Sequence, residues 1–94
     1  MPITANTQLL QSEGLDVHEA EDGLIVFDAE TDKVHHLNPT AGVIFELCSR
    51  QQSRTDLETL LIELYETEDL PLDAVRSTVQ QLADEGVLTV VDVS

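Results

Sequence analysis

Short apolar or alternating stretches, separated by polar turn segments, run from residue 15 to residue 37, a pattern typical of strands. Three strands are predicted, at Leu15–Ala20, 24–28 and Lys33–Leu37. The Asp22-Gly23 step between the first two suits the positive φ of a hairpin turn. Because short connections join antiparallel strands, we expect a meander whose first and third strands are edges.

Helical spacing of apolar residues begins after the third strand. The first two helices are predicted at 39–50 and 56–67. Asn38 and Pro39 open the first, because asparagine is a preferred N-cap and proline suits the first helical position. The pattern Thr55-x-x-Glu58 opens the second as a capping box.

A third helix is predicted to begin near Pro71 and to end at Gly86, a C-cap glycine, and residues 87–91 then predict a short closing strand. Residues 1–13 have no sustained period, so we expect a flexible N-terminal arm and a single domain at 14–94. The expected fold class is α+β: a three-stranded antiparallel sheet, three helices and a closing strand, in the order of a winged helix-turn-helix.

The predicted core is the apolar stripe of each helix together with the end of the third strand. Its members are Leu37, Ala41, Ile44, Phe45, Cys48, Leu57, Leu60, Leu61, Leu64, Val75, Val79 and Leu82. Such a core is mainly aliphatic, because the 94 residues include only three aromatic ones.

The net charge of −15 argues against several classes of protein. Winged helices usually bind DNA through the third helix, and the third helix predicted here has one base, Arg76. Phosphate backbones and anionic membrane surfaces require lysine and arginine, so we expect neither as a partner. No apolar run has the length of a membrane span, and no signal peptide is evident. With a single cysteine, the chain is expected to be cytoplasmic.

Catalytic and metal-binding patterns are also missing from the sequence. His35 and His36 are neighbours on a strand and point to opposite faces, so they cannot bind one ion together. Acidic residues occupy alternate positions over 28–32, as at the start of a calcium-binding loop. The glycine and the distal glutamate of such a loop are missing. Cys48 lies on a packing stripe, which predicts an inert core thiol. We therefore expect neither an enzyme nor a cofactor or metal.

A binding surface is the remaining possibility. The third strand, as an edge, offers unpaired N–H and C=O groups to an extended peptide. Lys33 lies on that strand and Arg76 on the third helix, so a groove between the two would be the non-acidic strip of the molecule. Two incidental surface bases remain the alternative. The acids likewise have two interpretations, solvation alone or steering toward a basic partner.

The order of the motifs carries a resemblance to a known family. A strand ending in Leu37-Asn38 is followed by the pattern Thr40-Ala41-x-x-Ile44-Phe45-Glu46-Leu47, then by a leucine-rich helix and by Val75-x-x-x-Val79-x-x-Leu82-x-x-x-Gly86-Val87-Leu88. This resembles the PqqD family of precursor-peptide recognition elements over residues 15 to 91. The chain departs from the family at two positions: Ala74 stands where Asp is common, and Thr78 where a large aromatic residue often occurs.

The resemblance implies a non-catalytic adaptor that binds the leader of a ribosomally synthesised precursor peptide and presents it to a modifying enzyme, often a radical S-adenosylmethionine (SAM) enzyme. The leader would add as a strand to the third strand and rest against the third helix. The residues implied are Lys33, Val34, His35, His36 and Leu37 for the edge, and Arg76, Val79, Gln80 and Ala83 for the helix wall. With Lys33 and Arg76 as donors, we expect a leader that carries Asp or Glu beside an apolar anchor.

Two other classes of protein remain open. One is a regulatory winged-helix protein that acts through protein contacts. The other is an acidic carrier protein, although no serine has the Asp-Ser-Leu context that phosphopantetheine attachment requires. The chain is expected to be a monomer or a weak homodimer, since an uncovered edge strand invites pairing.

Overall fold

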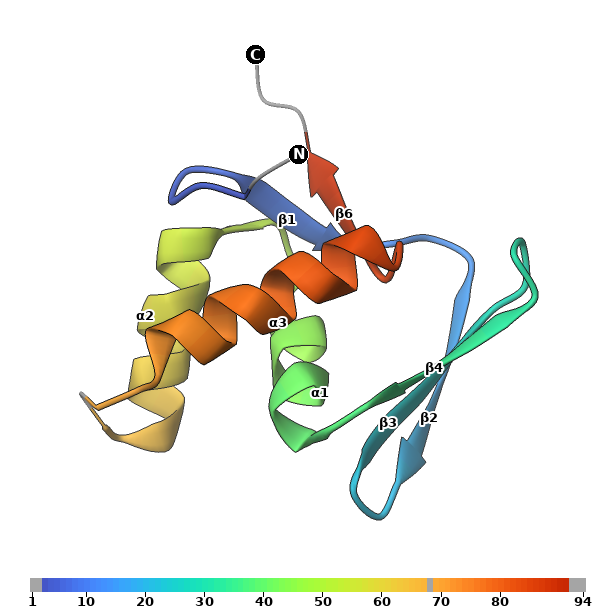
Figure 1. Ribbon diagram of the computed structural model, residues 1–94, viewed down its shortest axis with the longest axis horizontal. Coiled ribbons are helices and arrows are strands. Elements are labelled where there is room, and N and C mark those ends of the chain that lie inside the picture. Colours follow the sequence, from blue (N-terminus) through green and yellow to red (C-terminus); the bar gives the residue numbers. More distant parts are fainter. Residues whose placement is uncertain (1–2, 68, 92–94) are drawn as a thin grey trace.

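The structure, a computed structural model, describes residues 3–67 and 69–91. Over these residues it is α+β, with three helices and two antiparallel three-stranded sheets. One sheet has the order β2-β3-β4 and the other the order β5-β1-β6. Figure 1 shows the three helices gathered on one side, with the β2-β3-β4 sheet projecting away from them.

The β2-β3-β4 sheet confirms the predicted meander. Its strands are β2 at Leu15–Ala20, β3 at Gly23–Asp28 and β4 at Lys33–Leu37. β3 pairs with both neighbours, and β2 and β4 are the edges. Leu24 lies opposite Leu37 in the register, and Val26 lies opposite His35. Leu24, Val26 and Leu37 are buried, so this face of the sheet packs toward the helices.

Gly23 is required at the start of β3 by the close approach of β4. A Cβ atom at this position would collide with the backbone carbonyl oxygen of Leu37. The φ of Gly23 is +141°, a conformation that L side chains rarely adopt. Leu37 therefore directs its carbonyl group toward β3.

β4 runs into the first helix, α1 at Pro39–Leu47, through the single residue Asn38 (Figure 1). The Asn38 side chain accepts a hydrogen bond from the Ala41 N–H at 2.8 Å, as predicted for an N-cap. The helix ends earlier than the predicted 39–50, because Cys48 already leaves the helical conformation as the C-cap.

The second helix, α2 at Arg54–Tyr65, begins before the predicted 56–67. Its N-cap is Ser53, whose hydroxyl accepts from the Asp56 N–H at 3.0 Å. The predicted capping box at Thr55 is therefore wrong. Thr55 directs both its hydroxyl and its N–H to the Ala5 carbonyl oxygen at 3.1 Å. The cap is displaced because the residues before α2 form a strand, β5 at Gln52–Ser53.

The third helix, α3 at Leu72–Asp84, begins and ends where the sequence predicts. Gly86 has a φ of +79°, and its N–H donates to the Ala83 carbonyl oxygen at 3.1 Å. The Val87 N–H donates to the Leu82 carbonyl oxygen at 2.9 Å. This pair of bonds is a Schellman motif, in which glycine removes the steric penalty of the left-handed residue. The chain then enters β6 at Leu88–Val91.

The segment predicted as a flexible arm at 1–13 contains a strand within its described residues, while residues 1 and 2 lie outside the described part of the chain. Gln8–Gln11 form β1, the central strand of the second sheet, which pairs with β5 on one side and β6 on the other. Leu9 in this strand has no exposed surface. A single buried side chain gives no periodic pattern, and the pairing partners are distant in sequence, so local signals do not reveal the strand.

The predicted core is confirmed at ten of its twelve positions. Leu60 is only half-buried, and Leu64 is 56% exposed, so the prediction was wrong for these two residues of α2. The sequence prediction also omitted five buried residues that come from strands or precede one: Leu9, Leu24, Val26, Val87 and Leu88.

Leu9→Ala tests whether β1 is part of the core. A buried leucine cut to alanine leaves a cavity and is expected to lower the free energy of unfolding by about 2–5 kcal/mol. Leu64→Ala makes the same chemical change at an exposed position and should cost roughly 0.5 kcal/mol or less. Urea unfolding of both variants measures the difference. Equal costs would contradict the placement of β1.

Candidate functional site

The free edge of β4 is the first component of the candidate site. Because the Leu37 carbonyl points to β3 and amide directions alternate along a strand, Val34 and His36 direct their N–H and C=O groups away from β3. No other strand of the described residues pairs with β4 on that side. The edge thus has two residues whose backbone donors and acceptors are available to an added strand.

The side chains of β4 alternate between two faces. Val34 is 63% exposed, and His36 points to the same outer face, where its Nε2 lies 3.3 Å from the Asp22 Oδ1 atom. His35 and Leu37 point toward the helices, and the His35 side chain is 11% exposed. The two adjacent histidines therefore face opposite sides, as the sequence predicts.

A groove of about 210 Å³ lies between β4 and α3. Its lining residues on one side are Val34, His35, His36 and Leu37, followed by Asn38 and Ala41, and on the α3 side Thr78, Gln81, Leu82 and Glu85. His35 spans the two sides, with its Nδ1 atom 3.6 Å from the Glu85 Oε2 atom. The predicted edge residues from Val34 to Leu37 thus lie together beside α3, and Lys33 precedes them at the exposed start of the strand.

The predicted helix wall lies on other faces of α3. Arg76 is directed toward α2, and Val79 is fully buried. The side-chain oxygen of Gln80 accepts from the Ile3 N–H at 3.2 Å. Ala83 is half-buried, and none of these α3 residues lines the groove. Helical spacing identifies the core stripe of α3, but which flank of that stripe faces β4 depends on packing.

Glu58 explains why Arg76 is turned away from β4. This carboxylate is only 7% exposed, and it accepts from Arg76 Nη2 at 2.9 Å and Nε at 3.2 Å. Arg54 approaches it from the other side, with Nε at 3.5 Å from Oε2. The hydrogen bond to Glu58 raises the pKa of Arg76. Arg76 therefore joins α3 to α2, whereas Arg54 contacts Glu58 within α2, and the structure does not bring Arg76 and Lys33 together.

A second, apolar pocket of about 550 Å³ adjoins the groove beyond the end of β4. It lies between the start of α1, the end of α2 and the start of α3. Its lining residues are Asn38, Thr40, Tyr65, Thr67, Leu70, Pro71, Ala74, Val75 and Thr78.

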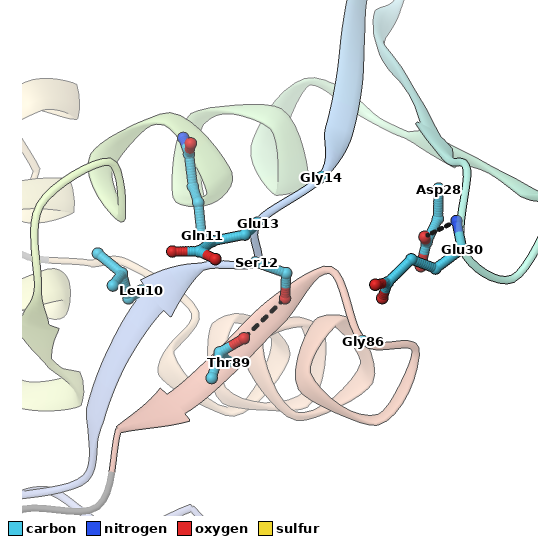
Figure 2. Close-up of a pocket in the computed structure, with 9 residues that line it drawn as sticks. All are labelled: Leu10, Gln11, Ser12, Glu13, Gly14, Asp28, Glu30, Gly86 and Thr89. Carbon is cyan, nitrogen blue, oxygen red and sulfur yellow. Dashed lines mark hydrogen bonds between the residues drawn. The ribbon is translucent and has the colours of Figure 1, made fainter.

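A third hollow, of about 720 Å³, is polar and acidic (Figure 2). The Ser12 and Thr89 hydroxyls form a hydrogen bond of 2.8 Å on one side, and Asp28 accepts from the Glu30 N–H at 3.0 Å on the other. Glu13 adds a further carboxylate to the lining. Across residues 3–67 and 69–91, no group of three or more His, Cys, Asp or Glu side chains has the arrangement of a metal site.

Cys48 is fully buried, and burial raises the pKa of its thiol to about 11. Because the thiolate is the reactive form, this cysteine has the properties of a packing residue.

The family comparison covers most of this architecture. The family described as "Coenzyme PQQ synthesis protein D (PqqD)", where PQQ is the cofactor pyrroloquinoline quinone, matches residues 23–88. The chain belongs to the PqqD family. This family is one of recognition elements for ribosomally synthesised and modified peptides, as the sequence motifs indicate. Comparison with curated proteins and with solved structures finds no match.

The matched PqqD region runs from the first residue of β3 to the first residue of β6. It therefore contains β4, α3 and the groove between them, whereas β1 and β2 lie before it. Membership supports a role as an accessory protein in PQQ or related peptide biosynthesis, in contact with a precursor peptide and a biosynthetic enzyme. No helix in the described part of the chain is long and apolar enough to cross a membrane.

Arg76→Ala is expected to lower the free energy of unfolding, because it removes the hydrogen-bonded partner of a buried carboxylate. Arg50→Ala is the matched control, since Arg50 is exposed in the connection after α1 and its replacement makes the same change of charge. Urea unfolding should show a clear loss for Arg76→Ala and little for Arg50→Ala. Equal stability of the two variants would contradict a structural role for Arg76.

Cys48 should react slowly with iodoacetamide in the folded protein. With a pKa near 11, roughly 0.1% of the thiol is ionised at pH 8, against roughly a quarter in the unfolded chain. The alkylation rate, followed by mass spectrometry, is expected to be at least about 100-fold lower without urea than with it. Comparable rates in the two conditions would show that the thiol is accessible.

Proposed function

We propose that this PqqD-family chain is a non-catalytic adaptor that captures the leader of a ribosomally synthesised precursor peptide and presents it to a modifying enzyme. The observation that supports this most directly is the unpaired edge of β4, which faces a groove beside α3. An extended peptide that adds to a sheet edge gains main-chain hydrogen bonds, whatever its sequence.

The register of the bound leader follows from the backbone of β4. Val34 and His36 offer donors and acceptors on the open side, so the leader pairs with these two residues and continues the sheet as a fourth strand. Its alternate side chains then point into the groove or to the outer face. The groove side meets Thr78, Gln81 and Glu85, a polar surface with both donors and acceptors.

Charge contributes less to leader selection than the sequence alone predicts. The expectation of an acidic leader depends on Lys33 and Arg76 together, and Arg76 is held by Glu58 on α2. Of the two bases, Lys33 at the exposed start of β4 can then attract an acidic side chain of the leader. An exposed pair of this kind is worth roughly 1 kcal/mol or less, so the main-chain bonds carry most of the affinity.

The modifying enzyme would contact the complex outside the groove. The outer face of the β2-β3-β4 sheet exposes the side chains of Val34, on the paired edge, and Ile25, on the neighbouring strand β3. The resemblance that the sequence carries makes a radical SAM enzyme the partner class to test first. The proposed scaffold is a winged helix-turn-helix, used for protein contacts because a net charge of −15 disfavours DNA. A regulatory protein with the same scaffold is the alternative, and it would bind no leader.

Val34→Pro tests strand addition directly. Its N–H faces the open edge, so proline there removes a donor for the leader without breaking a bond to β3. Titration calorimetry with synthetic leaders, taken from short reading frames beside the gene, is expected to show at least about a tenfold loss of affinity. Val34→Ala keeps the N–H and is the matched control.

A leader that binds wild type, Val34→Pro and Val34→Ala equally well would place the peptide elsewhere. No binding by any of the leaders would contradict the adaptor function. Circular dichroism and thermal unfolding of the proline variant establish that the fold is retained.

A further inference from the structure

The apolar pocket between α1, α2 and α3 continues the groove along the same helix. The two hollows share Asn38, which directly follows β4, and Thr78 in the middle of α3. Among the lining residues, Ala74, Thr78 and Gln81 of α3 and Glu85 at its C-cap recur at intervals of three or four residues and form one face of the helix, beside the buried Val75 and Leu82. A peptide paired with β4 and extended past Leu37 therefore enters the pocket without a change of direction along α3.

None of the described residues that line this pocket carries a charged side chain. Tyr65, Leu70, Pro71, Ala74 and Val75 supply most of it, in a chain with 19 acidic residues. The groove, in contrast, is bordered by Glu85, and the polar hollow beside Gly86, after the end of α3, is lined by three carboxylates. An uncharged, apolar pocket of about 550 Å³ suits an apolar ligand group.

Two small, uncharged residues of α3, Ala74 and Thr78, line this pocket. An aspartate at position 74 would place a charge there, and an aromatic side chain at position 78 would occupy part of the space. Ala74 and Thr78 therefore leave the pocket open.

We propose that this pocket binds an apolar anchor of the leader, a leucine, isoleucine or aromatic side chain. The anchor lies just outside the segment of the leader that pairs with β4, on the side where β4 ends at Leu37. The proposal rests on the adaptor function and specifies the class of leader that this chain selects. Main-chain pairing with β4 gives the register, and the anchor gives the preference for particular sequences. Val79, a member of the predicted helix wall, has no exposed surface and offers no contact to such an anchor.

Selection from a displayed library of random 16-residue linear peptides tests the anchor without knowledge of the natural leader. Peptides that bind wild type are expected to share one apolar residue beside a strand-like stretch. Changing that residue to serine should weaken binding at least about tenfold, measured by fluorescence anisotropy. Ala74→Asp should weaken binding of the original peptide by a similar factor. It should hardly change binding of the peptide that carries serine, because the two changes remove the same contact.

Ser77→Asp is the matched control, since it adds the same charge to an exposed position of α3 outside the pocket. Thr78→Phe is a second variant that fills the pocket without adding charge, and thermal unfolding checks the fold of each. Suppose that the selected peptides lose affinity for Val34→Pro but bind Ala74→Asp and Thr78→Phe with the same affinity as the wild-type protein. This result would overturn the proposed anchor site and leave the adaptor function unaffected. Failure to select any peptide, or peptides indifferent to Val34→Pro, would contradict the adaptor function itself.

Discussion

Between the last residue of β4 and the first residue of α1 the chain has one residue, Asn38, and its side chain is committed to capping the helix. The strand therefore cannot move independently of the bundle, and its open edge is held beside α3. The same junction places Asn38 in both the groove and the apolar pocket. A longer connection would allow the β2-β3-β4 sheet to fold over or swing away, so the short junction is what makes the edge a fixed surface.

Two further contacts keep the edge available and the wall in place. Gly23 allows β3 to approach β4 closely on the side away from the groove, which fixes the direction of the β4 amides. On the other side of α3, the Glu58 carboxylate binds Arg76, so that this face of α3 is tied to α2. The space between β4 and α3 is bridged by the single His35–Glu85 contact among the ion pairs of the described residues. A helix tied on one face leaves the opposite face for a ligand.

The sequence predicted β4 and its edge position well, because short turns and local alternation are enough to define a meander. It failed where the outcome depended on distant partners. β1 was missed because Gln8 pairs with Ser53 and Val91, far along the chain. The sequence prediction put Arg76 at the groove, because local patterns do not reveal its partner Glu58, which belongs to another helix 18 residues away. Helical periodicity identified Val75, Val79 and Leu82 as core, but it could not assign the flanks on either side of that stripe.

The distribution of charge suggests that one set of groups attracts a peptide at long range and another set recognises it at short range. Arg54 and Arg76 both lie beside the single carboxylate of Glu58, which offsets part of their charge, and the chain as a whole has a large acidic excess. Such a surface attracts basic segments of a peptide or enzyme over distances of about a Debye length, in a manner that salt weakens. The edge of β4 and the apolar pocket, in contrast, act through main-chain bonds and burial, which salt affects little. On the proposed function, a leader with basic residues outside its paired segment would therefore be captured quickly, while its register and identity would be decided by groups that carry no charge.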